Sequence, residues 1–384
     1  MLQIQSPLVS VEWLHEHLEA QNLIVLDATI PKVSGDVSYD SGELIPKSRF
    51  FDIKTKFSDV NAEFPNTLPS IKQFQDEARK LGVNRNSPIV AYDKHGIYSS
   101  ARAWWLFKYF GHENVAVLDG GFPEWKECGF DIEQQYFIDF EEGNFFATEH
   151  KELMTNFEGI KEYSHDKDAL IIDARAKKRF SGEVPEPRKG LRSGTIPNSK
   201  NLPYTDLLIN KKFRSVSELK EIFEDVNFEQ NHLVFSCGSG ITACNLALAA
   251  TLAGYDKLTV YDGSWTEYGS LTKSFLDTPN WSKDELIAYI LLYASHSDLK
   301  EDNHERNVII SKVDMQTFQK IHDEFSNDND FQSIQKILAS IERHNYSKEK
   351  LEELLVDIKA LFFADGDFDI REHLMLLFLK RILK

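Results

Sequence analysis

The feature of this sequence that most constrains its fold is one pattern that occurs twice along the chain. Each copy opens with an apolar run that ends in aspartate and continues through an Ile-Pro-x-Ser segment. A second apolar run then leads through a loop of small residues into a helix-like stretch, and an Asp-Gly pair followed by tryptophan ends the copy. The segments are residues 23–27, 44–48, 88–93 and 119–125 in the first copy, and 169–173, 195–199, 232–237 and 262–268 in the second. The repeat predicts two domains of the same architecture.

The alternation within each copy indicates the fold class. Short apolar runs separated by helical segments are typical of βαβ units and a parallel sheet. We therefore expect two α/β domains, residues 1–140 and 155–278, with parallel sheets flanked by helices. The stretch 136–158 between them is polar, acidic and weakly periodic, as expected of a linker.

The C-terminal part of the chain has a different pattern. From Lys283 onward there is no proline and one glycine, Gly366, while apolar residues recur at helical spacing. This predicts a separate all-α domain over residues 283–384. The expected helices are 284–298, 306–325, 330–344, 347–363 and 370–383.

Length and charge narrow the classes of function. A chain of 384 residues suits two or three domains. The formal net charge of −17 disfavours nucleic acid, which needs cationic neutralisation, and anionic membrane surfaces, so neither is expected as a partner. Three cysteines give no disulfide framework and favour a reducing compartment. The N-terminal residues show no signal-peptide pattern and no long apolar run occurs, so we expect a cytoplasmic location.

One loop of the second copy has the composition of a thiolate site. Cys237 follows a predicted strand and precedes a helix expected to begin near Ile241. Ligands bind at the carboxyl ends of strands in open α/β sheets. Glycines let successive N–H groups turn toward the sulfur, and the helix adds the positive end of its dipole. Both effects favour the thiolate, which is the form that attacks another sulfur. The predicted catalytic residues are Cys237 and Ser239, and the predicted loop residues are Gly238, Gly240, Ile241 and Thr242.

The same loop carries a resemblance to a known family. The run Cys-Gly-Ser-Gly-Ile-Thr-Ala-Cys at 237–244 is similar to the active-site loop of 3-mercaptopyruvate sulfurtransferases, members of the tandem-rhodanese family. In that family only the second domain holds the reactive cysteine, and Asp93 occupies the matching place here. The resemblance implies that Cys237 carries sulfur as a persulfide, taken from a small anionic donor such as 3-mercaptopyruvate. A thiol or cyanide would be the acceptor, with a thioredoxin-like protein as one candidate, and no metal or organic cofactor is implied.

Other cysteine loops are alternatives. A phosphatase of the Cys-x5-Arg type needs arginine six residues after the cysteine to hold phosphate bidentately, and that position is Ala243. The thiosulfate-specific branch of the family resembles Cys-Arg-Lys-Gly-x-Thr, whereas Gly238 and Ser239 replace both cations here. Thiosulfate therefore stands as the second candidate donor. A persulfide relay or binding protein that is loaded by another protein is a further alternative.

Arginines that follow the first strand of the second copy provide a site for a carboxylate. The stretch 173–188 is similar to the family's substrate-binding stretch. The resemblance implies that Arg179 and Arg188 hold the carboxylate and keto oxygen of mercaptopyruvate, for which a planar guanidinium is well suited. By the same match, Tyr98 is expected to reach the substrate from the first domain. Arg175 and Asp173 are expected to be structural partners.

Ser239 has a second expected role, because its hydroxyl can donate a hydrogen bond to the sulfur or to the departing enolate. Related enzymes use an aspartate and a histidine of the first domain in a proton relay with this serine. The matching positions here are Lys54 and Asn66. Asn66 can form a hydrogen bond but cannot act as a base, so neither residue is assigned a catalytic role.

The helical tail weakly resembles the TerB family of helical domains. Its run of acidic residues, Asp365, Asp367 and Asp369, is similar to the start of a calcium loop. However, the sixth position is Ile370 and the twelfth is Leu376, where an EF-hand requires glycine and glutamate. We therefore expect a helix cap at this turn and no metal site.

Overall fold

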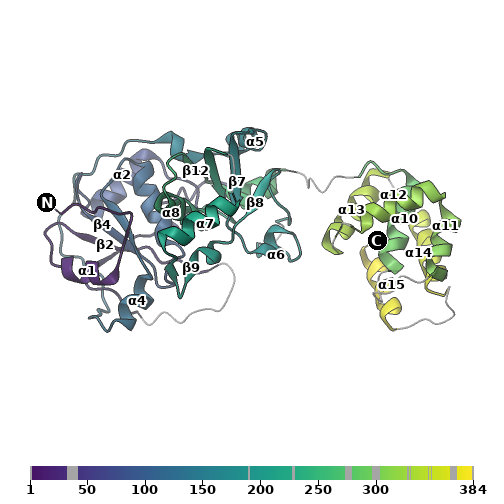
Figure 1. Cartoon of the computed structure of the whole chain (residues 1–384), viewed down its shortest axis with the longest axis horizontal. Coiled ribbons are helices and arrows are strands. Elements are labelled where there is room, and N and C mark those ends of the chain that lie inside the picture. Colours follow the sequence, from purple (N-terminus) through teal and green to yellow (C-terminus); the bar gives the residue numbers. More distant parts are fainter. Residues whose placement is uncertain are drawn as a thin grey trace. The chain divides into compact units, whose positions relative to one another are not determined.

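The computed structural model describes residues 2–32, 42–188, 191–226, 230–272, 279–295, 303–326, 328, 330–344, 346, 348–363 and 370–382. The chain divides into two compact units, Met1–Ser181 with Pro185–Thr272, and Gly182–Val184 with Lys273–Lys384. The first unit is α/β and the second is helical (Figure 1). None of the described helices has the length and apolar character that a membrane crossing requires.

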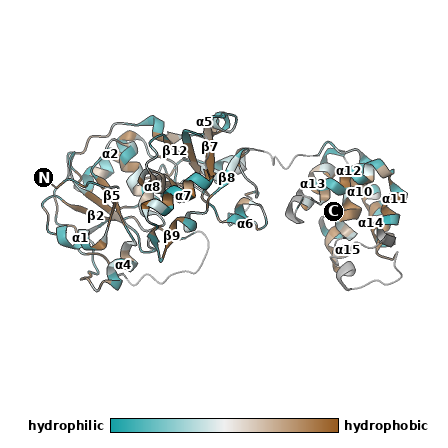
Figure 2. Ribbon diagram, viewed as in Figure 1, coloured by the Kyte–Doolittle hydropathy of each residue, from teal (hydrophilic) through white to brown (hydrophobic). Residues whose placement is uncertain are grey.

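The first sheet of the α/β unit has five parallel strands in the order β1-β5-β4-β2-β3. Every residue of its three central strands is buried, which is the pattern of a parallel sheet covered on both faces (Figure 2). The strands are β1 (Leu8–Val9), β2 (Ile24–Asp27), β3 (Ser48–Phe50), β4 (Ile89–Tyr92) and β5 (Val115–Leu118). The helices are α1 (Val11–His17), α2 (Ile71–Lys80), α3 (Ser100–Tyr109) and α4 (Gly121–Glu127).

The second sheet repeats this order as β6-β12-β11-β7-β8, again with parallel pairing. Matching strands of the two copies thus occupy matching places, and the predicted pair of parallel-sheet α/β domains is confirmed. The strands are β6 (Met154–Thr155), β7 (Ala169–Asp173), β8 (Ser199–Asn201), β11 (His232–Ser236) and β12 (Leu258–Tyr261), with a hairpin of β9 (Leu208–Ile209) and β10 (Lys212–Phe213). The helices are η1 (Lys151–Leu153), α5 (Phe157–Tyr163), α6 (Lys177–Phe180), η2 (Tyr204–Leu207), α7 (Val216–Val226), α8 (Ala243–Ala253) and α9 (Ser264–Leu271).

Helices α3 and α8 pack against each other and join the two α/β domains. Almost every residue of both helices is buried, and one apolar cluster continues through both domains. Because each helix is covered on nearly all sides, neither has the apolar stripe of a surface helix. The two α/β domains therefore share one core.

Matching residues make matching contacts across this junction. Arg102 of α3 donates to the carbonyl oxygen of Gly240 at 3.3 Å. Asn245, at the corresponding place in α8, donates to the carbonyl oxygen of Tyr98 at 3.3 Å. Each domain thus holds the strand-to-helix loop of the other.

A second pair of contacts follows the same symmetry. The amide of Leu68 in the first domain donates to Asp262 of the second at 2.7 Å. The amide of Phe213, in the β9–β10 hairpin of the second domain, donates to Asp119 of the first at 2.9 Å. The junction therefore fixes the loops that surround each sheet's carboxyl edge.

The second unit is a set of helices packed around α10, which is buried along most of its length. The helices are α10 (Lys283–Ser295), α11 (Asn303–Lys312), α12 (Met315–Phe325), α13 (Asp330–His344), α14 (Lys348–Phe362) and α15 (Ile370–Ile382). The prediction of a single helix over 306–325 is wrong, because the helical conformation is interrupted between α11 and α12. Asp314 accepts hydrogen bonds from the amides of Gln316 and Thr317 and so starts a new helix.

Candidate active site

The predicted cysteine loop lies at the carboxyl edge of the second sheet. Strand β11 ends at Ser236, Cys237 follows directly, and α8 begins at Ala243, close to the predicted start. Gly240 has a φ of 72°, in the left-handed region, and a Cβ at this position would lie 2.5 Å from the carbonyl oxygen of Asp262. Glycine is therefore required there by both conformation and space.

Cys237 is 1 % exposed and lines a pocket of about 220 Å³. The hydroxyl of Ser264 lies 3.8 Å from its sulfur, and the same oxygen accepts the amides of Cys237 and Gly240, both at 3.0 Å. Ser264 itself has a φ of 48°, which is uncommon for a residue with a side chain. The structure thus shows a hydroxyl at this sulfur, and the ring of inward amides stays a prediction.

The matching strand-to-helix loop of the first domain surrounds a carboxylate with backbone amides. Asp93 stands in the place of Cys237 and is fully buried. One of its carboxylate oxygens accepts the amides of Tyr98, Ser99 and Ser100 at 2.8, 2.9 and 3.0 Å. Successive amides therefore converge on one negative group at this point of the fold.

Ser239 lies between residues of both domains. Its hydroxyl oxygen lies 3.0 Å from Arg188 Nη2 and 3.0 Å from Asn66 Nδ2. Asn66 is a buried residue of the first domain, whereas Lys54, the other altered relay position, is exposed. The sequence assigned Asn66 no catalytic role, and the structure places its side-chain amide against the Ser239 hydroxyl.

The two predicted substrate arginines differ in their partners. Arg179 forms an ion pair with the buried carboxylate of Glu186 at 2.5 Å. Glu186 also pairs with Arg175 at 2.9 Å, and Arg175 in turn pairs with Asp173 at 2.7 Å, which confirms the expected structural pair. Burial disfavours the Arg175 cation, but the two carboxylates raise its pKa above the ordinary value.

Arg188 has the freer guanidinium of the two. It forms no salt bridge among the residues that the structure describes. Burial lowers its pKa, and the nearby Cys237 sulfur opposes this effect. A Cβ at Gly238 would lie 3.3 Å from Arg179 Nη2 and 3.7 Å from Arg188 Nη1, so both guanidinium groups lie against the loop at its glycine.

All predicted site residues except Gly240 line this pocket. Tyr98 is among them, and residues that the sequence analysis did not single out, such as Lys32, Tyr204 and Thr205, also line the pocket. Lys32 Nζ lies 5.5 Å from the centre of the Tyr98 ring. The pocket therefore also includes a cationic side chain from the first domain, besides the arginines of the second.

The other two cysteines differ from Cys237. Cys244 is fully buried in α8 and donates to the carbonyl oxygen of Gly240 at 3.3 Å. Burial raises its pKa to about 12, so it remains a thiol at neutral pH. Cys128 is exposed and lies far along the chain from the loop, after α4.

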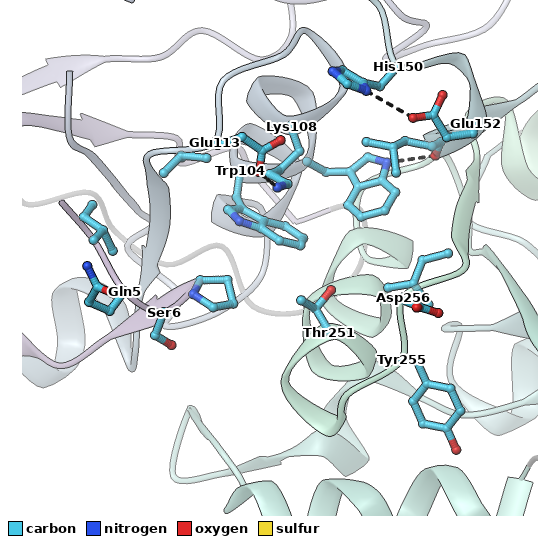
Figure 3. Close-up of a pocket in the computed structure, with 16 residues that line it drawn as sticks. Gln5, Ser6, Trp104, Lys108, Glu113, His150, Glu152, Thr251, Tyr255 and Asp256 are labelled. Carbon is cyan, nitrogen blue, oxygen red and sulfur yellow. Dashed lines mark hydrogen bonds and ion pairs between the residues drawn. The ribbon is translucent and has the colours of Figure 1, made fainter. Parts of the chain in front are cut away.

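A second, larger pocket of about 440 Å³ lies between α3, the N-terminal residues and the end of α8 (Figure 3). Trp104 and Trp105 form part of its wall. Lys108 pairs with Glu113, and His150 Nδ1 lies 3.1 Å from Glu152, so these polar groups have partners within the pocket wall. Because no cysteine lines it, the smaller pocket is the one equipped for sulfur chemistry.

Metal chemistry has no support in the described part of the chain, where no cluster of three or more His, Cys, Asp or Glu side chains could hold an ion. Asp365, Asp367 and Asp369 lie outside the described residues.

Comparison with known proteins identifies the fold family. A rhodanese-like domain model matches residues 10–128 and 157–271. The 3-mercaptopyruvate sulfurtransferase of Mus musculus is 38% identical over 277 residues, which cover 69% of this chain and 93% of the relative. The thiosulfate sulfurtransferase of Rattus norvegicus is 35% identical over 272 residues, 68% of this chain and 91% of the relative. The crystal structure of SseA from Escherichia coli, a 3-mercaptopyruvate sulfotransferase, aligns with a TM-score of 0.61 at 32% identity and covers 68% of this chain and 99% of that one. This chain belongs to the rhodanese family, with two rhodanese-like domains of which the second carries the cysteine.

Proposed function

We propose that this chain is a sulfurtransferase that moves sulfur from 3-mercaptopyruvate to a thiol or cyanide acceptor through a persulfide on Cys237 and releases pyruvate. The observation that carries the proposal is the composition of one pocket, in which the cysteine faces two arginines across a loop without a cation. The names of the mouse and E. coli relatives point to the same donor.

Each site residue has a proposed role. Arg188 binds the carboxylate of the donor because its guanidinium has no competing carboxylate partner among the described residues. Arg179, held in place by Glu186, contacts the keto oxygen. Tyr98 and Lys32 close the pocket from the first domain.

In the proposed transfer, the Cys237 thiolate attacks the thiol sulfur of mercaptopyruvate. The new S–S bond forms as the C–S bond breaks, and its electron pair becomes the enolate of pyruvate. The thiol proton of the donor ends on the enolate carbon, so no outside oxidant or reductant is needed. The outer sulfur of the persulfide lies one bond, about 2.05 Å, beyond Cys237 Sγ. There the loop amides stabilise its negative charge as the matching amides stabilise Asp93.

The acceptor then takes the outer sulfur in a second step, which gives ping-pong kinetics. We propose a reducing cytoplasmic setting and a small or thioredoxin-like thiol as the acceptor, in keeping with the cysteine content. We also assign residues 1–140 to the domain without the cysteine, 155–278 to the catalytic domain and 283–384 to a TerB-like helical domain.

Thiosulfate is the second candidate donor, because the rat relative is named for it. Its sulfonate would lie next to the transferred sulfur, where Gly238 and Ser239 offer no cation. Steady-state assays of both donors with cyanide decide between them. Rapid loading from a cysteine desulfurase with poor turnover of both small donors would instead favour a relay protein.

Intact mass measurement tests the central claim. After treatment with mercaptopyruvate the protein should gain the mass of one sulfur, and Cys237→Ser should gain none. A gain that persists in Cys237→Ser would refute the assignment of the nucleophile.

A further inference from the structure

The hydroxyl oxygen of Ser239 has two hydrogen-bond donors around it. Arg188 Nη2 and Asn66 Nδ2 both lie 3.0 Å away. A serine hydroxyl has two acceptor lone pairs and one proton. Because a guanidinium has no acceptor, and the Asn66 nitrogen has none either, these contacts occupy both lone pairs. The proton of Ser239 must therefore point elsewhere.

The orientation of the Asn66 amide follows from a second contact. Asn66 Nδ2 also lies 3.2 Å from the backbone carbonyl oxygen of Ser239, which can only accept. A flipped amide would place two oxygens against each other, so the nitrogen is the atom that faces Ser239.

The backbone of Asn66 is held just as firmly. Its carbonyl oxygen accepts from Nη2 of the fully buried Arg102 at 2.9 Å, and Arg102 is paired with Asp262 at 2.6 Å. Asn66 has a φ of 64°, a left-handed conformation that asparagine adopts more readily than most residues. The contact with Ser239 is therefore part of a connected polar network that spans both domains.

No described residue accepts the Ser239 proton, and Ser239 lines the pocket beside Cys237. We propose that Asn66 is a positioning residue that orients Ser239 as a hydrogen-bond donor to the keto oxygen of the bound sulfur donor. Negative charge develops on this oxygen as the C–S bond breaks, so a fixed donor there lowers the barrier. The inference rests on the proposed function and assigns Asn66 no proton of its own to transfer.

Asn66→Asp tests the polarity of the contact. Aspartate has the same shape and tolerates the left-handed conformation, but its carboxylate accepts the Ser239 proton. The rate of persulfide formation at saturating mercaptopyruvate, followed by quenched-flow mass measurement, should fall roughly 100-fold, as on removal of one oxyanion donor. Asn66→Gly keeps the backbone conformation and leaves the Ser239 proton free. The rate of persulfide formation should therefore fall less in Asn66→Gly than in Asn66→Asp. Aspartate also places an oxygen against the Ser239 carbonyl oxygen, so the Ser239→Ala background is needed to separate a loss that acts through the Ser239 hydroxyl from this repulsion.

Ser239→Ala separates this effect from the added charge. If Asn66→Asp acts through Ser239, it should cause no further loss in the Ser239→Ala background, whereas a charge effect would persist there. Should the aspartate variant not fold, Asn66→Gly decides: loading at the wild-type rate overturns the inference, because orientation of Ser239 by Asn66 requires a loss, up to that of Ser239→Ala. Wild-type protein that gains no sulfur from mercaptopyruvate overturns the proposed function together with this inference. Wild-type protein that loads while Asn66→Asp loads equally fast overturns the inference alone.

Discussion

Arg179 and Arg188 line the same pocket but differ in whether a carboxylate of the protein neutralises their charge. The Arg179 charge is largely balanced by Glu186, which lies behind it and is fully buried. Arg188 contacts the Ser239 hydroxyl and keeps its charge for a ligand. Partial burial also removes water that would screen this charge. Replacing Arg188 should therefore weaken the binding of an anionic donor more than replacing Arg179.

Replacing Arg188 by alanine should lower kcat/KM for mercaptopyruvate by roughly 10- to 100-fold, the range expected for one charged hydrogen bond of about 1.5–3 kcal/mol. Most of the change should be in KM, because the carboxylate is bound equally in the ground and transition states. Steady-state kinetics measure it. Arg214→Ala, which removes an equal charge from a partly buried pair with Glu218 and from no residue of the pocket lining, is the matched control. A loss of the same size with a donor that has no carboxylate would contradict the role.

At the scale of elements, the β9–β10 hairpin of the second domain covers the sheet edge of the first. Lys212 pairs with Glu124 at 2.8 Å, and the Phe213 amide donates to Asp119. This contact partly buries the Asp119 carboxyl, and burial raises its pKa although the Phe213 amide and Lys212 oppose the shift. The hairpin therefore contacts a carboxyl group whose pKa is higher in the folded protein than in the unfolded chain.

The stability of this attachment should depend on pH. Because the folded-state pKa of Asp119 is raised, its favourable contribution is complete below the unfolded value of about 3.9 and is lost as pH rises through the folded value. Asp119→Asn keeps an acceptor for Phe213 and does not titrate. Calorimetric melting between pH 4 and 7 should therefore show the variant gaining stability relative to wild type as pH rises. A difference that is constant with pH, or that falls, would show that Asp119 is not the titrating group.

The sequence predicted helices and strands well where the burial of consecutive residues determines the order of apolar and polar positions. Strands β2, β4, β7 and β11 are apolar runs because both faces of a parallel sheet are covered. The break at Asp314 was missed because apolar periodicity continues across it, although an aspartate before a helical stretch is a known start signal.

The part of the site that could be predicted from the sequence is the part that lies within one domain. Cys237, Arg179 and Arg188 lie in one domain and in recognisable stretches of sequence, and the structure places them in one pocket. Asn66 and Lys32 come from the other domain, and Asn66 meets Ser239 across 173 positions of sequence. No local pattern encodes such a meeting, because it depends on how α3 and α8 bring the two sheets together.

At the scale of the whole molecule, each unit has its own core. The apolar cluster of the α/β unit includes Cys237 and both central helices. The helical unit has a separate cluster around α10, which includes Tyr289 and Ile358. All residues of the candidate site belong to the α/β unit. The match to SseA covers 68% of this chain and 99% of the SseA chain.

The chain shortened to residues 1–278 should therefore fold and should form the Cys237 persulfide from mercaptopyruvate at the wild-type rate. The reason is that no core residue and no pocket residue of the α/β unit is removed. Circular dichroism and melting establish folding, and quenched-flow mass measurement gives the rate. Cys237→Ser in the shortened chain is the control for non-specific sulfur uptake. If the shortened protein is folded but loads sulfur much more slowly, the helical unit takes part in the first half-reaction. If loading is unchanged but transfer to a protein thiol is slower, the helical unit acts in the second half-reaction, on the acceptor.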